Sequence, residues 1–191
     1  MQNTLITLPH PHLRESSKKV GIINDDITKL IERMRAITLD WEASREHEVG
    51  VALAAIQIDI PLRVVVVRND FDNKQDTTFR ALINPVITKY EGEQVEDFEG
   101  CLSVKDIYGK VPRYSKVRVK ALDLTGKEVR LSAEGFLARV FQHEIDHTNG
   151  KVFIDHIKDS PLAFYTLGAE GNLQQMDYEK EVKDRKDLWG E

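Results

Sequence analysis

A His-Glu-x-x-His motif carries the clearest chemistry in this sequence. His143, Glu144 and His147 stand together in the segment QHEIDH. Residues four apart lie on one face of a helix, so both imidazoles can reach one cation. Glu144 then projects beside the cation, where its carboxylate can take a proton from a bound water. The spacing predicts a metal site, against the alternative of two unrelated surface histidines.

A catalytic metal usually has three protein ligands and one open position, so a third ligand is needed. Asp155 and His156 follow the motif closely, just past Gly150. Cys101, the only cysteine, lies upstream beside Gly100, which permits close backbone approach. A lone cysteine is more often a buried small apolar residue. The residues alone therefore leave the third ligand open.

Three blocks, in order along the chain, resemble the peptide deformylase family. They are residues 50–57 (GVALAAIQ), residues 99–103 (EGCLS) and the segment QHEIDH. Shorter similarities occur at residues 13–14 (LR), 83–85 (INP), 111–113 (VPR) and 150–155 (GKVFID). The likeness covers roughly residues 8–155, and three ordered blocks are far more specific than any one of them.

The resemblance implies an enzyme that removes the formyl group from the N-terminal formyl-methionine of new peptides and releases formate. It implies a divalent metal, commonly Fe²⁺ with Zn²⁺, Ni²⁺ or Co²⁺ as substitutes, held by Cys101, His143 and His147. Glu144 would be the catalytic acid and base. The Gln57 amide and the Leu102 N–H would hold the oxyanion. The substrate cleft would be lined by Gly50, Val51, Ala52 and Gly100.

One departure concerns the cleft. The family usually has glycine where this chain has Ala52, and the added methyl could narrow the cleft or disfavour a positive φ. One alternative is therefore a deformylase-like protein that binds metal or formyl-peptides with weak or altered activity. Another is a general endopeptidase whose third ligand is not Cys101. The family's leucine is Thr148 here, a change without an evident reason in the sequence.

Several other polar residues near these motifs have open roles. Glu99 either contacts the site or orients its loop, and the sequence does not separate the two. We expect Asp146 to be exposed rather than to support a ligand. His10, His12 and His47 are expected at the surface.

The bulk properties exclude several classes of protein. The 191 residues carry a formal charge of −5, which argues against a nucleic-acid partner. No apolar stretch reaches bilayer length and the N-terminus has no secretory pattern, so we expect no membrane association. One cysteine excludes an intrachain disulfide and fits a reducing, cytoplasmic setting. The predicted partners are formyl-methionyl peptides, at the ribosome exit; the oligomeric state stays open.

Apolar periodicity indicates which elements position these residues. Asn24 to Asp26 can cap a helix whose apolar stripe runs from Ile27 to Trp41 and which ends before Gly50. Residues 62–67, 117–121 and 128–131 read as strands, with a hairpin turn at residues 124–127. The strand at Leu82 and Ile83 is expected to be interrupted by a turn at residues 84–85. The motif helix is expected from Ser132 to beyond His147, closed by Gly150.

These elements predict an α+β fold of mostly antiparallel strands packed around a central motif-bearing helix. Residues 1–160 are predicted to be a single deformylase-like catalytic domain. Residues 161–191 are predicted to be a C-terminal extension, helical or frayed, because the tail from Asp177 mixes charges of both signs.

Overall fold

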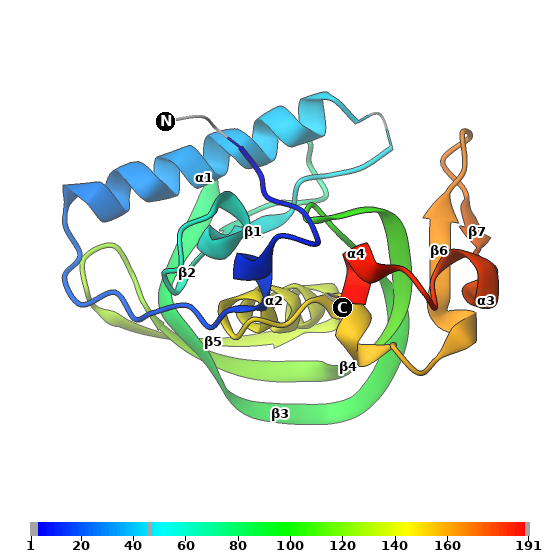
Figure 1. Cartoon of the computed structure of the whole chain (residues 1–191). Coiled ribbons are helices and arrows are strands. Elements are labelled where there is room, and N and C mark those ends of the chain that lie inside the picture. The colour runs from blue at the N-terminus through cyan, green and yellow to red at the C-terminus, as the bar shows by residue number, and fades with distance from the viewer. Residues whose placement is uncertain (1–3, 46, 190–191) are drawn as a thin grey trace.

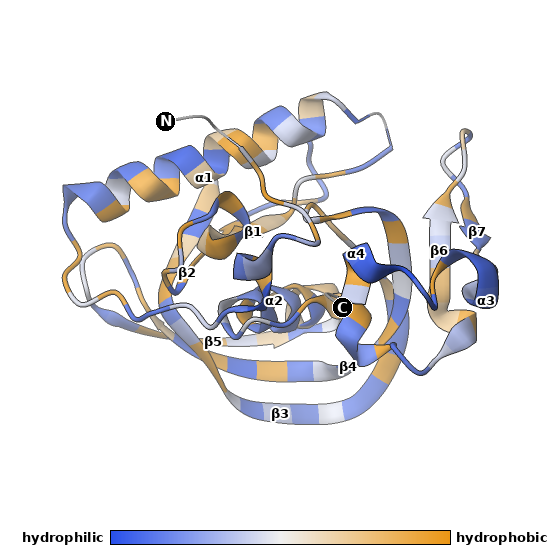
Figure 2. Cartoon of the chain, viewed as in Figure 1, coloured by the Kyte–Doolittle hydropathy of each residue, from blue (hydrophilic) through white to orange (hydrophobic). Residues whose placement is uncertain are grey.

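The computed structural model describes residues 4–45 and 47–189. Helix α1 (Asp25–Ala43) has the predicted cap, since the Asn24 side-chain oxygen accepts from the N–H groups of Asp26 and Ile27 at 3.2 and 3.3 Å. The apolar and polar bands along α1 in Figure 2 are its two faces. The predicted stripe confirms this helix, since its residues are buried up to Ile37 and only Trp41, at its end, is half-buried. The buried members are Ile27, Leu30, Ile31, Met34 and Ile37.

Antiparallel pairing joins every strand of the described residues into one sheet, in the order β1-β2-β3-β4-β6-β7, with β5 paired to β4. The strands are β1 (Ala52–Ala54), β2 (Val64–Arg68), β3 (Phe79–Cys101), β4 (Val104–Leu122), β5 (Glu128–Glu134), β6 (Phe164–Leu167) and β7 (Leu173–Gln175). The predicted α+β class is confirmed.

Helix α2 (Gly135–Thr148) carries the motif and packs against strands β1 to β5. Figure 1 shows β3 and β4 curling around it, with α1 on the other side of the sheet. Strand β2 separates the two layers. Its Val65 and Val67 belong to the core that includes Phe141 of α2, whereas Val64 and Val66 belong to the α1 core. Both faces of β2 are covered, which explains its uninterrupted valine run.

The turn predicted at Asn84 and Pro85 is wrong, because β3 continues through both residues. Asn84 takes a φ of +53° and the register with β4 shifts between Ile83 and Val86, so the chain forms a bulge. The Asn84 amide exchanges hydrogen bonds with the Val20 backbone at 2.8 and 2.9 Å. Because proline has no N–H to donate to the neighbouring strand, it fits at a bulge, where the strand can continue without that hydrogen bond.

The predicted start of the motif helix is three residues early. Ser132 and Glu134 still belong to β5, paired with Arg118 and Lys116 of β4. The chain turns at Gly135, whose φ is +58°, and α2 begins there. Pairing of β5 with β4 outweighs the tendency of Ser132 to cap a helix. Sequence periodicity does not report this pairing, because it depends on a distant strand.

The C-terminal segment folds back onto the sheet. It contains the short helices η3 (Phe153–His156), η4 (Pro161–Ala163), α3 (Tyr178–Glu181) and α4 (Lys186–Trp189), with the β6–β7 hairpin between η4 and α3. Val182 and Leu188 are buried in a cluster with Phe153 and Phe164. We expected helix or fraying here; short helices are present, and the hairpin was not anticipated. No helix in the described residues is long and apolar enough to cross a membrane.

Candidate active site

The predicted sulfur and the two imidazoles meet at one point. Cys101 ends β3 at the turn into β4, and His143 and His147 project from α2. The Cys101 Sγ lies 3.3 Å from His147 Nε2, which lies 3.2 Å from His143 Nε2. One ligand atom of each residue falls within 4.8 Å of the others. This spacing suits three ligands of one divalent cation.

The other candidates for a third ligand lie elsewhere. Asp155 pairs with Arg14 at 2.6 Å and accepts the Val152 N–H at 2.8 Å. His156 contacts Asp146 at 2.7 Å. Both residues have partners in the protein and stand outside the cluster that contains Cys101.

Glu99 lies behind His143 and settles its orientation. The Glu99 carboxylate is 2.9 Å from His143 Nδ1. A carboxylate accepts, so Nδ1 carries a proton and Nε2 is the nitrogen that faces the cluster. Arg113 and Arg139 both donate to Glu99 at 2.8 Å. Burial alone would raise the pKa of Glu99, but hydrogen bonds from His143 and Arg113 hold it far below its usual range.

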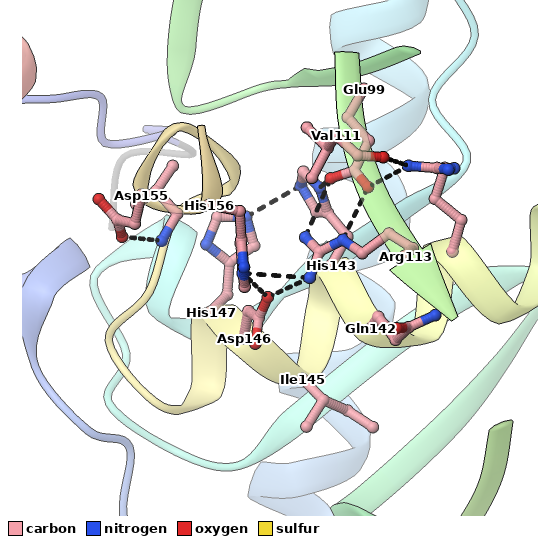
Figure 3. A network of polar contacts seen from close by, with 12 residues as sticks. Glu99, Val111, Arg113, Gln142, His143, Ile145, Asp146, His147, Asp155 and His156 are labelled. Atoms are coloured by element: carbon pink, nitrogen blue, oxygen red, sulfur yellow. Dashed lines mark hydrogen bonds and ion pairs between the residues drawn. The ribbon is translucent and has the colours of Figure 1, made fainter. Parts of the chain in front are cut away.

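The expectation that Asp146 is exposed is wrong. Its side chain is 18% exposed, pairs with Arg113 at 2.5 Å and contacts His156 at 2.7 Å. Figure 3 shows Arg113 lying between Glu99 and Asp146. Arg113 is itself buried, so its two carboxylate partners compensate its charge. Asp146 therefore supports His143 indirectly, through Arg113 and Glu99.

Glu144 and His147 are both buried, and each has a polar side-chain atom without a hydrogen-bond partner in the part of the chain that the structure describes. Glu144 Oε2 and His147 Nδ1 have no hydrogen-bond partner among the described residues. Burial raises the pKa of Glu144 to about 7, with the His143 charge opposing the shift. Burial also lowers the pKa of His147 well below its ordinary value, which keeps the imidazole neutral. A neutral imidazole is the form that binds a metal.

Gln57 reaches the same point from the short helix η2 (Ala55–Ile58). Its Oε1 accepts the Ala54 N–H at 2.8 Å, which directs its Nε2 toward Ser103 Oγ at 3.2 Å and Cys101 Sγ at 3.6 Å. Leu102 occupies the turn between β3 and β4 and lines the same cleft. The Gln57 amide is thus fixed with its donor facing the cluster.

A cleft of about 380 Å³ opens onto this cluster and is lined by Val51, Ala52 and Gly100, as the resemblance implied. Gly50 is the exception among the four, because it is buried against Thr38 of α1. Ala52 lies in β1 and is not among the residues with positive φ, so its methyl causes no backbone strain there. A Cβ at Gly100 would lie 2.7 Å from the Tyr108 ring, which explains the glycine.

Three supporting residues had no predicted role. They are Ser103, whose N–H points to Cys101 Sγ at 3.4 Å, and the buried Arg113 and Arg139. Ser103 and Arg113 fall inside the family-like segments at residues 99–103 and 111–113, so the resemblance could have pointed to them. Arg139 stands four residues before His143 on the same helix face. Only the folded structure shows that it is buried and donates to Glu99. Thr148 is buried, and its hydroxyl donates to the Ile145 carbonyl at 2.8 Å.

The donor set itself fits a divalent transition metal. One sulfur and two imidazoles suit Fe²⁺, Zn²⁺, Ni²⁺ or Co²⁺, whereas Mg²⁺ and Ca²⁺ prefer oxygen. An α+β fold that brings a thiol and a His-Glu-x-x-His pair together at a cleft defines a class of metal-dependent hydrolases. Within that class, comparison with known proteins identifies the family.

The polypeptide deformylase family model matches residues 2–162. A peptide deformylase of Thermomicrobium roseum is 41% identical over 170 residues, 87% of this chain and 92% of that protein. One from Halothermothrix orenii is 46% identical over 147 residues, 77% of this chain and 88% of that protein. The crystal structure of a Legionella pneumophila peptide deformylase superposes with a TM-score of 0.71 at 38% identity, covering 80% of this chain and 84% of that one. The chain belongs to the peptide deformylase family and is a hydrolase.

Proposed function

We propose that this enzyme removes the N-formyl group from the N-terminal formyl-methionine of nascent peptides and releases formate. The observation that carries the proposal is the convergence of Cys101, His143 and His147 within 4.8 Å, at a cleft also lined by Glu144 and Gln57. Membership of the family supports the choice of substrate.

Glu144 is proposed to handle both proton transfers. Its unpaired Oε2 is buried beside the cluster, so it can take a proton from the attacking water and deliver it to the leaving amine. An amine leaves poorly without that proton. The Gln57 Nε2 and the Leu102 N–H are proposed to stabilise the charge that grows on the formyl oxygen. Val51, Ala52 and Gly100 would hold the peptide along the cleft.

The metal would be held by Cys101, His143 and His147. When bound, it supplies a Lewis acid that polarises the formyl carbonyl and lowers the pKa of water. We propose Fe²⁺ as the resident ion. Glu99 keeps the His143 ring oriented for that role through its contact with Nδ1 at 2.9 Å.

The competing functions have less support. A general endopeptidase needs a third ligand other than Cys101, and Asp155 and His156 both have other partners. A binding protein with weak activity was suggested by Ala52. Ala52 lines the cleft, but so do Glu144, Gln57 and Leu102, the residues proposed here for proton transfer and for the oxyanion.

The test is formate release from formyl-methionyl peptides by anaerobically purified, iron-loaded protein. Glu144→Gln should lower kcat by about 10²–10⁴-fold with metal content unchanged, because the general acid-base group is lost. Glu93→Gln, a change at an exposed position on β3, is the control and should keep full activity. Absence of formate release from the metal-loaded wild-type enzyme would refute the function.

We also propose where the enzyme works and how the chain is divided. Its substrates arise where formylated chains leave the ribosome, so we place it in the cytoplasm near the exit. Residues 1–160 would form the catalytic domain, and residues 161–191 an extension of it.

A further inference from the structure

The C-terminal hairpin forms part of the wall of the catalytic cleft. Leu167, Gly171 and Leu173 line the same cleft as Cys101 and Glu144. Figure 1 shows β6 and β7 standing at one side of the molecule, beside the curled strands β3 and β4. A peptide with its formyl group at the metal cluster can therefore meet the hairpin with a later residue.

The hairpin is held firmly at its base. Strand β6 pairs with β4 through Tyr108 opposite Tyr165. Phe164 is fully buried in the cluster that includes Leu188 of α4. The Tyr165 ring meets the Phe98 ring edge-on, with centroids 4.9 Å apart. These contacts fix the wall, so side chains on it can discriminate between ligands.

The tip of the hairpin meets the loop that follows α1. Gly171 has a φ of +80°, and a Cβ there would lie 3.0 Å from the His47 ring. The Gly168 N–H donates to the Asn172 carbonyl at 2.8 Å and closes the tip. His47 also lines the cleft, so the hairpin and this loop bound it together.

This part of the wall is largely apolar. Leu167 and Leu173 are half-buried, and Phe98, also in the lining, is 38% exposed. Apolar side chains left accessible in a cleft favour an apolar ligand, because binding removes both surfaces from water. The family model ends at residue 162 and β6 begins at Phe164, so these leucines lie outside the region that the model matches.

We propose that Leu167 and Leu173 form a subsite for an apolar side chain located beyond the methionine of a formyl-peptide. The proposal rests on the proposed deformylation. The subsite selects among formyl-peptides and contributes to binding, whereas the chemistry stays with the metal cluster and Glu144.

The first test uses the wild-type, metal-loaded enzyme. Formyl-Met peptides carry leucine or aspartate at the second, third or fourth residue, with alanine elsewhere. We expect kcat/KM to favour leucine by about tenfold at one of these positions, the gain typical of burying one such side chain. Equal values at all three positions would overturn the subsite. No turnover of any peptide would instead refute the proposed function, and the subsite with it.

The second test replaces both leucines by serine. Leu167→Ser with Leu173→Ser should abolish the preference for leucine through KM, while kcat/KM on formyl-Met-Ala stays within about twofold. Leu162→Ser is the matched control, since Leu162 belongs to the same segment and is 76% exposed. An equal loss on long and short peptides would mean that the hairpin has only a structural function. If the double variant fails to fold, the wild-type series decides.

Discussion

Among the residues that the structure describes, two clusters bring three potential metal ligands within 4.8 Å of one another, and they differ in almost every other respect. One is Cys101, His143 and His147 in the cleft. The other is His10, His12 and Asp59, where the N-terminal segment meets the end of η2. The inner cluster contains the buried His147, whereas the side chains of His12 and Asp59 are 43% and 49% exposed.

The groups around the two clusters favour different partners. In the outer cluster, His12 Nδ1 lies 2.5 Å from an Asp59 carboxylate oxygen, and the hydrogen bond that His12 donates to Asp59 raises the pKa of His12. The protonated form of the His12 imidazole is therefore stabilised. In the inner cluster, burial lowers the pKa of His147, so that imidazole keeps a lone pair for a metal. Burial would also lower the pKa of His143, but its hydrogen bonds with Cys101 and Glu99 raise it well above the ordinary value, so a metal must displace the proton from Nε2.

The comparison shows that proximity of ligand atoms does not define a metal site. What distinguishes the inner cluster is burial, which keeps His147 neutral, together with the hydrogen bond from His143 to Glu99, which orients the His143 ring. The outer cluster is a histidine–carboxylate pair with a second histidine beside it. The three predictions that follow test this difference.

The largest expected effect is on metal content. After metal loading and dialysis, we expect one ion per chain in the wild type and in His12→Gln, and none in Cys101→Ser. The serine hydroxyl does not ionise to replace a thiolate, so the inner cluster loses a strong ligand. Elemental analysis measures the content, and formate release should fall to background only in Cys101→Ser. If the wild type instead bound two ions and His12→Gln bound one, the outer cluster would also be a metal site and the contrast between the clusters would be wrong.

A smaller effect is expected from the supporting residue Glu99. Glu99→Gln keeps the shape but removes the charge that orients His143 and compensates Arg113 and Arg139. Metal affinity should fall by about 10–100-fold, as competition with a chelator would measure. Glu96→Gln, at an exposed position on the same strand, should leave the affinity unchanged. Unchanged affinity in Glu99→Gln would mean that burial alone prepares the inner cluster.

The smallest effect concerns stability at the outer cluster. Because the folded-state pKa of His12 is raised, its pair with Asp59 stabilises the fold fully below the ordinary histidine pKa of about 6.5 and is lost as pH rises through the folded value. The difference in Tm between wild type and His12→Gln should therefore be largest near pH 5.5 and vanish in alkaline buffer. Asp59→Asn should show the same profile. A difference independent of pH would exclude this origin.

Much of the fold could be predicted from periodicity. The α1 stripe, the valine run of β2 and the alternation of β4 each report which faces are covered, and the structure confirms them. The bulge at Asn84 and the extension of β5 to Glu134 could not be predicted. Both depend on pairing with β4, whereas the local signals of Pro85 and Ser132 favour a turn and a helix start.

By itself, the sequence determined that His143 and His147 share one helix face with Glu144 beside them, because helical geometry fixes neighbours four residues apart. It left the third ligand open between Cys101, Asp155 and His156. The tertiary structure favours Cys101 among these candidates, since the path of β3 brings a thiol 46 residues away in sequence to 3.3 Å from His147. Only the tertiary structure shows that Glu99 contacts His143 and that the β6–β7 hairpin lines the cleft, because burial and long-range contacts exist only in the folded chain.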